Sequence, residues 1–375
     1  VPMSLYLWLF LLAAVCAAFG SDPKWERISY GLSFLCLASF LTFRYAQGTD
    51  WLAYNYIFMS APVTINLNSI YYTEAFHSEF GWKLINNLWR SLGFDFISLS
   101  ILISVLEMYF LGRFLKRYSP NRALSLVLAC PVIYFVYFFS ALRQGLVVAV
   151  FLGLMLPMLE NEQHGKFILL DLLLSTIHSG ALALLLLLVV QKIQIKHIFT
   201  LIVASVCIGV GLSFVLQYIV SLIGISYETS GANPLALIYR LVIYSITVML
   251  YSGRNSVDTS SKLLFKCYSI GFCIYLVFMS NELISSRLAA PLLAIECALL
   301  PALLKGQSRQ GSVLLLCIIS MCLVMYLKNI SAAIDQSKYI EEISVFNYPY
   351  ISVFNTSDIY HYSTSYYYLS FLKPI

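Results

Sequence analysis

The chain has 375 residues, of which 60% are hydrophobic, 15% aromatic and only 11% charged. A soluble globular domain carries about 25% charged residues, so this composition excludes a water-soluble enzyme, a disordered chain and a small disulfide-stapled domain. The apolar runs are continuous rather than alternating, which is typical of membrane-spanning helices. The sequence therefore predicts an all-helical polytopic membrane protein.

Ten apolar runs are close to the length that spans a bilayer. They lie near residues 3–19, 28–43, 96–112, 123–140, 142–159, 198–222, 235–252, 267–280, 288–304 and 312–327. A further run, residues 167–190, is interrupted by Asp171 and by the sequence STIHSG at residues 175–180. We expect about ten full transmembrane helices plus a short broken or re-entrant pair, twelve helices in all, in one membrane domain over residues 1–375.

The distribution of charge predicts which loops lie in the cytoplasm. Residues 113–122 carry four Arg or Lys residues and no acid, which the positive-inside rule places in the cytoplasm. The other basic loops share that side only if the run 167–190 enters and leaves on one face, with Lys166 and Lys192 together. Residues 44–95 and 328–375 are then periplasmic.

These two periplasmic segments have different characters. Within residues 44–95, an amphipathic helix is expected over residues 79–94 and at the membrane interface, because its apolar side chains recur one turn apart. These side chains are Phe80, Leu84, Leu88 and Leu92. The segment 328–375 is rich in tyrosine.

The cysteines do not indicate a metal site, and the basic residues do not indicate a nucleic-acid-binding surface. All nine cysteines fall inside apolar runs, without polar metal ligands at the usual spacing, so neither disulfides nor a zinc site is expected. The 23 Lys and Arg residues are dispersed among short loops. We therefore expect no cofactor, no metal and no nucleic-acid partner.

Arginines near the predicted outer ends of the spans point to an anion site. They are Arg44, Arg143, Arg240 and Arg287. A guanidinium below the membrane surface is costly unless it meets a carboxylate or phosphate, for which its planar fork of donors is suited. Gln144 follows Arg143 at the start of an apolar helix, whose free N–H groups would add to such a site. The alternative is that these arginines contact lipid headgroups or pair with Glu228, Glu282 and Asp50.

Two further motifs contain titratable groups. In RYAQGTDW, residues 44–51, Arg44 and Asp50 flank Gly48, which can turn the chain as it leaves the membrane. The alternative for this motif is an ordinary charged helix exit. In STIHSG, the lone His178 lies deep enough to act in catalysis, although such a residue is more often a structural hydrogen-bond donor.

Four motifs occur in the order and at the intervals of a known family. They are RYAQGTDW at residues 44–51, EFGW at 79–82, ALRQGLVVAVFLG at 141–153 and STIHSGAL at 175–182. Over about residues 40–185 the chain resembles the EpsG-like branch of the bacterial Wzy-type polysaccharide polymerases. Trp51 departs from this resemblance, since a tyrosine is expected after the aspartate.

The resemblance implies an inner-membrane glycosyltransferase related to the GT-C superfamily. Such an enzyme transfers a growing glycan from undecaprenyl diphosphate to the next lipid-linked repeat unit on the periplasmic face, without a cofactor. The product would be O-antigen of lipopolysaccharide, capsule or exopolysaccharide. Its partners would be lipid-linked glycans as donor and acceptor, membrane lipid and a chain-length regulator.

This function gives each candidate residue a role. The four arginines and Gln144 would bind the diphosphate, while Asp50, Glu79 or His178 would accept a proton from the acceptor hydroxyl. Trp51 and Trp82 would stack on sugars. Two other classes stay open at this point: a flippase or transporter of lipid-linked oligosaccharides, and a membrane acyltransferase that modifies a glycan.

Overall fold

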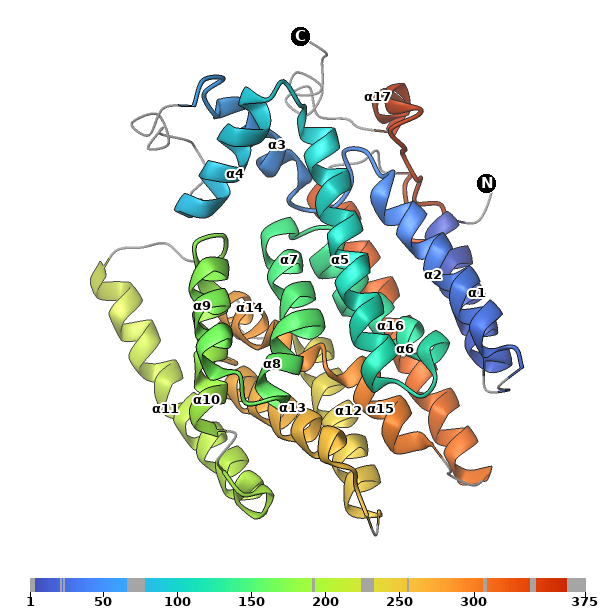
Figure 1. The fold of residues 1–375 in the computed structure, drawn as a ribbon, viewed down its shortest axis with the longest axis vertical. Coiled ribbons are helices and arrows are strands. Elements are labelled where there is room, and N and C mark those ends of the chain that lie inside the picture. Colours follow the sequence, from blue (N-terminus) through green and yellow to red (C-terminus); the bar gives the residue numbers. More distant parts are fainter. Residues whose placement is uncertain are drawn as a thin grey trace.

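A computed structural model describes residues 4–20, 22, 24–65, 78–190, 193–223, 233–254, 256–305, 309–337 and 342–362. Within these ranges the chain is helical and contains no strand (Figure 1). The first half holds α1 (Leu5–Phe19), α2 (Glu26–Thr42), α3 (Trp51–Ser60), α4 (Phe80–Ser91), α5 (Phe96–Tyr118), α6 (Arg122–Ala129), η2 (Cys130–Phe138), α7 (Leu142–Val150), η3 (Phe151–Met155), α8 (Leu156–Glu160), α9 (His164–Ser175), η4 (Ser179–Leu185) and α10 (Leu186–Val190). The second half holds η5 (Ile195–His197), α11 (Ile198–Ile223), α12 (Pro234–Ser252), α13 (Thr259–Val277), α14 (Glu282–Leu293), α15 (Glu296–Leu304), α16 (Arg309–Ser337), η6 (Thr356–Asp358) and α17 (Ile359–Tyr362).

Short polar side chains fix where several long helices begin. Asp95, Asn121, Asn233, Asp258 and Asn281 each precede a helix and accept a hydrogen bond from a backbone N–H of its first turn. These bonds satisfy donors that have no partner inside the helix. The apolar residues that follow then continue each helix into the bundle.

The chain is a multi-pass helical membrane protein, but ten full spans are not confirmed. Six described helices are long and apolar enough to cross a membrane, and the pair α14 and α15, bent by 47°, would be a seventh. Several expected runs fold as shorter or interrupted helices. The run 123–140 forms α6 and the π-helix η2, and α1 has only 15 residues.

The run 167–190 is broken, as its sequence predicts. α9 ends at Ser175, and the 3-10 helix η4 begins at Ser179 after the three residues Thr176–His178. The two helices pack against each other. Lys192, which is expected on the same side as Lys166, lies outside the described residues.

Two short helices form a cap at one end of the bundle. In Figure 1, α3 and α4 lie above the upper ends of α7 and α9, whereas the α12–α13 connection lies at the opposite end. α4 lies within residues 79–94, where the amphipathic interfacial helix is expected. Phe80 and Leu92 on its apolar stripe are exposed, while Trp82, Asn86 and Asn87 face the protein.

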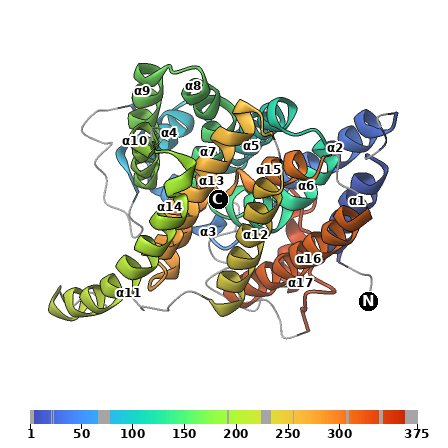
Figure 2. The same cartoon turned by 90° about the horizontal axis from the view of Figure 1, so that it is seen from below.

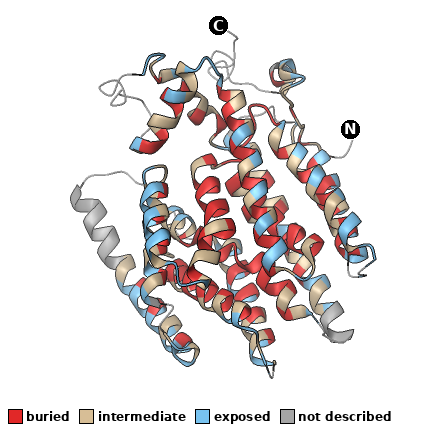
Figure 3. Ribbon diagram, in the orientation of Figure 1, coloured by how far each residue is buried: buried red, intermediate tan, exposed pale blue. Residues whose placement is uncertain are grey.

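The buried core runs through the centre of the bundle, and the outer helices are exposed to the surroundings (Figure 3). α11 lies at one edge and extends away from the other helices when the bundle is seen from below (Figure 2). Many of its side chains, including Phe199 and Ile208, are large, apolar and exposed. Such a surface suits contact with lipid.

The C-terminal segment begins later than expected and packs back onto the first two helices. α16 continues to Ser337, beyond the expected boundary at residue 328. The ring of Tyr348 stacks on Tyr6, with centroids 4.8 Å apart, and Tyr350 stacks on Phe40 at 3.8 Å. The tyrosines at positions 366–368 lie outside the described residues.

Candidate functional site

The EFGW motif docks on the break in the STIHSG motif. The backbone N–H of Gly81 donates to the Thr176 carbonyl at 2.7 Å. A Cβ atom at position 81 would lie 2.2 Å from Thr176 Oγ1 and 2.8 Å from Thr176 O, so only glycine permits this approach. The contact fixes the N-terminus of α4 against the segment that links α9 to η4.

Glu79, the residue before α4, joins the two motifs to a third. Its Oε2 accepts a hydrogen bond from Nη1 of Arg143, the second residue of α7. Its Oε1 accepts hydrogen bonds from the Ser179 backbone N–H at 2.9 Å and from Ser179 Oγ at 3.0 Å. His178 Nδ1 lies 3.7 Å from the same oxygen, beyond hydrogen-bond length.

The environment of Glu79 keeps its carboxyl ionised. Burial by itself would raise the pKa of Glu79, but the hydrogen bond from the Ser179 backbone and the charge of Arg143 outweigh it, so the pKa lies below its usual value. A carboxylate with a low pKa and both oxygens bonded is a weak proton acceptor. Glu79 therefore serves this arrangement as an anchor.

Asp50 lies at the N-terminus of α3 and has a different environment. Its Oδ1 accepts a hydrogen bond from Thr49 Oγ1 at 3.0 Å. Burial raises the pKa of the Asp50 carboxyl, and the charges of Arg287 and Arg143 oppose this shift. A carboxylate with a raised pKa is the better proton acceptor of the two.

Two polar side-chain atoms at this site have no bonding partner in the described part of the chain, and a further cation lies near them. Nε of Arg143 and Nε2 of His178 are buried and have no hydrogen-bond partner among the described residues. The Arg287 side chain is exposed, and its charge acts on Asp50. Gln144 Nε2 donates to the Arg287 carbonyl at 2.8 Å, which ties α7 to α14. Gln144 thus positions Arg287 in this structure.

Arg44 has hydrogen-bond partners of its own and closes the end of a π-helix. Its guanidinium donates to the carbonyls of Phe138 and Phe139, at 3.1 Å each, to the Leu41 carbonyl and to Ser104 Oγ. The side chain is 2% exposed. The carbonyls at the end of η2 need such donors because no helical N–H follows them. In this conformation Arg44 is a structural residue, contrary to the expected phosphate contact.

Gly48 makes the turn that brings Arg44 to this position. Its φ of 96° lies in the left-handed region, as expected for a turn at the exit from α2. A Cβ atom there would lie 2.5 Å from the Phe139 carbonyl oxygen. The RYAQGTDW motif therefore packs directly on the residues that precede ALRQG.

Arg240 also has an internal partner. Its Nη1 lies 2.9 Å from both carboxylate oxygens of Glu296, and the Tyr268 hydroxyl donates to the same carboxylate at 3.0 Å. Both members of the ion pair are buried. The guanidinium is thus bonded within the bundle, to an acid that the sequence analysis did not name as its partner.

The two tryptophans expected to stack on sugars are buried. Trp51 is 2% exposed and packs edge-on against Tyr45 and Phe96. Trp82 has no exposed surface and packs against Tyr54. Neither ring offers a face to a ligand in this conformation, so both belong to the core beneath α3 and α4.

Two residues beside the expected ones complete the arrangement. Ser179 supplies two of the hydrogen bonds to Glu79, and the ring of Tyr54 lies 5.5 Å from the Arg143 guanidinium carbon. Ser179 belongs to the STIHSG motif, so the sequence already marked the segment that contacts Glu79. Nothing in the sequence distinguishes Tyr54 from the chain's 26 other tyrosines. Among the described residues no three His, Cys, Asp or Glu side chains are placed to hold a metal ion.

These features define a class of protein: a multi-pass helical membrane protein that gathers arginines, carboxylates and a histidine from four motifs at one end. The model of the EpsG family matches residues 27–352. The chain belongs to this family, which indicates a polysaccharide polymerase-like function. No curated protein and no solved structure matches it, so the expected relation to the GT-C fold stays a prediction.

Proposed function

We propose that this protein polymerises oligosaccharide repeat units carried on a lipid diphosphate, by glycosyl transfer between two such lipids. The observation that supports this most directly is the Glu79 carboxylate, which links Arg143 to the Ser179 and His178 segment. Cations, carboxylates and free polar atoms thereby meet at one end of the bundle. The cations can stabilise a charged leaving group, and a carboxylate can accept the proton of a hydroxyl nucleophile.

Arg143 and Arg287 are the proposed diphosphate ligands. Arg143 opens α7, where free backbone N–H groups favour an anion, and its Nε has no hydrogen-bond partner within the described ranges. Glu79 neutralises part of its charge while holding the fork in place. Arg287 supplies a second cation that has no acid bound to it among the described residues. The two together stabilise charge that develops on the diphosphate.

Asp50 is the proposed proton acceptor. The hydroxyl oxygen of the acceptor sugar attacks the anomeric carbon of the donor, and the bond from that carbon to the diphosphate oxygen breaks. The bonding electron pair leaves with the diphosphate, and the hydroxyl proton passes to the Asp50 carboxylate. His178, whose Nε2 has no partner in the part of the chain that the structure describes, orients the acceptor hydroxyl beside it.

Membership of the EpsG family also suggests the natural substrates and the cellular location that we propose. The lipid would be undecaprenyl diphosphate in the bacterial inner membrane, with the α3–α4 end facing the periplasm. The product would be O-antigen, capsule or exopolysaccharide, whose length a regulator protein would set.

A deletion strain tests the reaction class. Loss of a polymerase leaves single repeat units on the cell surface, and complementation restores the ladder of longer chains. A strain that displays no repeat unit would instead indicate a flippase. Normal ladders that lack an acyl group would indicate an acyltransferase.

A further inference from the structure

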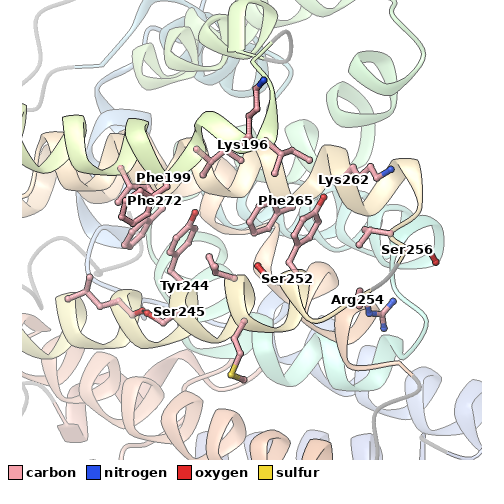
Figure 4. Close-up of a pocket in the computed structure, with 18 residues that line it drawn as sticks. Lys196, Phe199, Tyr244, Ser245, Ser252, Arg254, Ser256, Lys262, Phe265 and Phe272 are labelled. Atoms are coloured by element: carbon pink, nitrogen blue, oxygen red, sulfur yellow. The ribbon is translucent and has the colours of Figure 1, made fainter.

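A large cavity lies far from the candidate site, among α11, α12 and α13 (Figure 4). Its volume is about 980 Å³. The lining is mainly apolar and includes Ile202, Leu241, Val248 and Met249. Residues of the α12–α13 connection line one end of the cavity, and this connection lies at the opposite end of the bundle from the α3–α4 cap (Figure 1). No residue proposed for glycosyl transfer lines this cavity.

Two stacked aromatic pairs line the cavity, and its outer edge is exposed. Tyr244 stacks on Phe272, and Tyr251 stacks on Phe265, each with ring centroids 4.0 Å apart. Stacked aromatic pairs give a long apolar surface of fixed shape. On the outer edge, Phe199 is 74% exposed, so the groove opens at the surface of the bundle.

A second, polar cavity of about 470 Å³ adjoins the first at Arg254, which lines both. Arg117 and Lys305 line the polar cavity, and Lys262 lines the same end of the apolar one (Figure 4). Two acids are nearby but have internal partners. Asp258 accepts a hydrogen bond from the Ser261 backbone, and Glu160 accepts from Arg117 and Ser260.

We infer that an anionic membrane phospholipid binds here, with its phosphate among Arg254, Lys262 and Lys305 and its acyl chains in the apolar groove. The geometry couples a membrane-facing apolar slot to a cationic end, which matches the two parts of such a lipid. Basic pockets between transmembrane helices are suited to lipid phosphate groups. An apolar helix from a partner would leave the cationic end without a counter-charge. This inference is independent of the proposed reaction.

The test is lipid retention by the purified full-length protein, measured by native mass spectrometry and by titration with phosphatidylglycerol and phosphatidylcholine. The wild type should retain phosphatidylglycerol preferentially. The double variant K262Q/K305Q should bind it about 25-fold more weakly, at about fivefold for each removed charge. The control is R113Q/K116Q, which removes two exposed charges from α5 outside both cavities and should retain the lipid normally.

A second variant keeps the test decisive. Val248→Trp fills the apolar groove and should displace the lipid without changing the cationic end. Equal retention by K262Q/K305Q and the control would overturn the inference. Displacement of the lipid by millimolar inorganic phosphate would show a phosphate site rather than a lipid site. A stable dimer of the wild type without bound lipid would show that a second copy covers the groove.

Discussion

The Glu79 carboxylate and the Arg143 guanidinium are 64 residues apart in sequence, yet they form an ion pair at the N-termini of α4 and α7. About four-fifths of each side chain is shielded from solvent. Because Glu79 also accepts two hydrogen bonds from Ser179, the pair ties three separate segments together. Arg143 is therefore held in one orientation before any substrate binds, which favours catalysis by preorganised charge.

We expect Arg143→Lys to impair polymerisation almost as much as Arg143→Ala. Lysine keeps the positive charge but loses the planar fork, which contacts Glu79 and which we propose also binds the diphosphate. Both variants should lower the rate by about 100-fold, as removal of one preorganised donor does in other enzymes. The measurement is the ladder of lipid-linked polymer at matched protein levels. A near-normal ladder for the lysine variant would assign Arg143 to simple charge balance.

Gly81→Ala should separate α4 from the STIHSG break. The new methyl group would overlap Thr176 Oγ1 and the Thr176 carbonyl oxygen, so we expect a loss of roughly 1–3 kcal/mol in the free energy of unfolding. Polymerisation should fall as well, because Glu79 moves with α4. Gly165→Ala is the matched control, since no atom lies within 4 Å of a Cβ there. Equal unfolding temperatures for the two variants would refute this close contact.

The sequence motifs indicated which segments come together in the fold. They were less informative about the role of each residue. EFGW, ALRQG and STIHSG are recognisable in the sequence, and contacts made by Glu79, Gly81, Arg143 and Ser179 join them in space. Arg44 and Arg240 were indistinguishable from Arg143 in sequence, because charge and position along a span do not reveal an internal partner. Their partners are the carbonyls at the end of a π-helix and Glu296. Neither the π-helix nor that pairing has a local sequence signature.

The number of membrane spans was overestimated from the sequence for a related reason. Hydropathy detects apolar runs, but it does not detect where a helix bends or changes its hydrogen-bond pattern. The run near residues 288–304 is uniformly apolar apart from Glu296, yet α14 and α15 meet at 47°. The run 123–140 changes to a π-helix at Cys130. The break at Thr176–His178 was predictable because polar residues and a glycine interrupt the apolar sequence there.

Arg44→Lys should reduce stability rather than the chemistry. A lysine ammonium would satisfy fewer of the carbonyls of Leu41, Phe138 and Phe139, and buried charge-assisted hydrogen bonds contribute about 3 kcal/mol at most each. We expect a lower yield and unfolding temperature, with normal turnover per folded molecule. The measurements are thermal unfolding in detergent and polymer formed per folded protein. A normal unfolding temperature with lost lipid-diphosphate binding would return Arg44 to the substrate site.

The pH dependence of polymerisation tests Asp50 as the proton acceptor. The ionised carboxylate is the active form, so the rate should fall as the pH drops through the pKa of Asp50, which burial raises above its ordinary value. Arg287 opposes that shift. Arg287→Gln should therefore raise the pKa further and move the acidic limb of the residual activity to higher pH.

The profile should be measured as initial rates in proteoliposomes between about pH 5 and pH 8, a range in which raised carboxyl pKa values are found. Asp50→Asn should lower the rate by about 10²–10⁴-fold and remove the limb, because the amide cannot accept the proton. Arg113→Gln, a control near the C-terminus of α5, should leave the acidic limb of the pH profile in place. Normal activity for Asp50→Asn, or a limb that Arg287→Gln does not move, would transfer the proton-accepting role to His178.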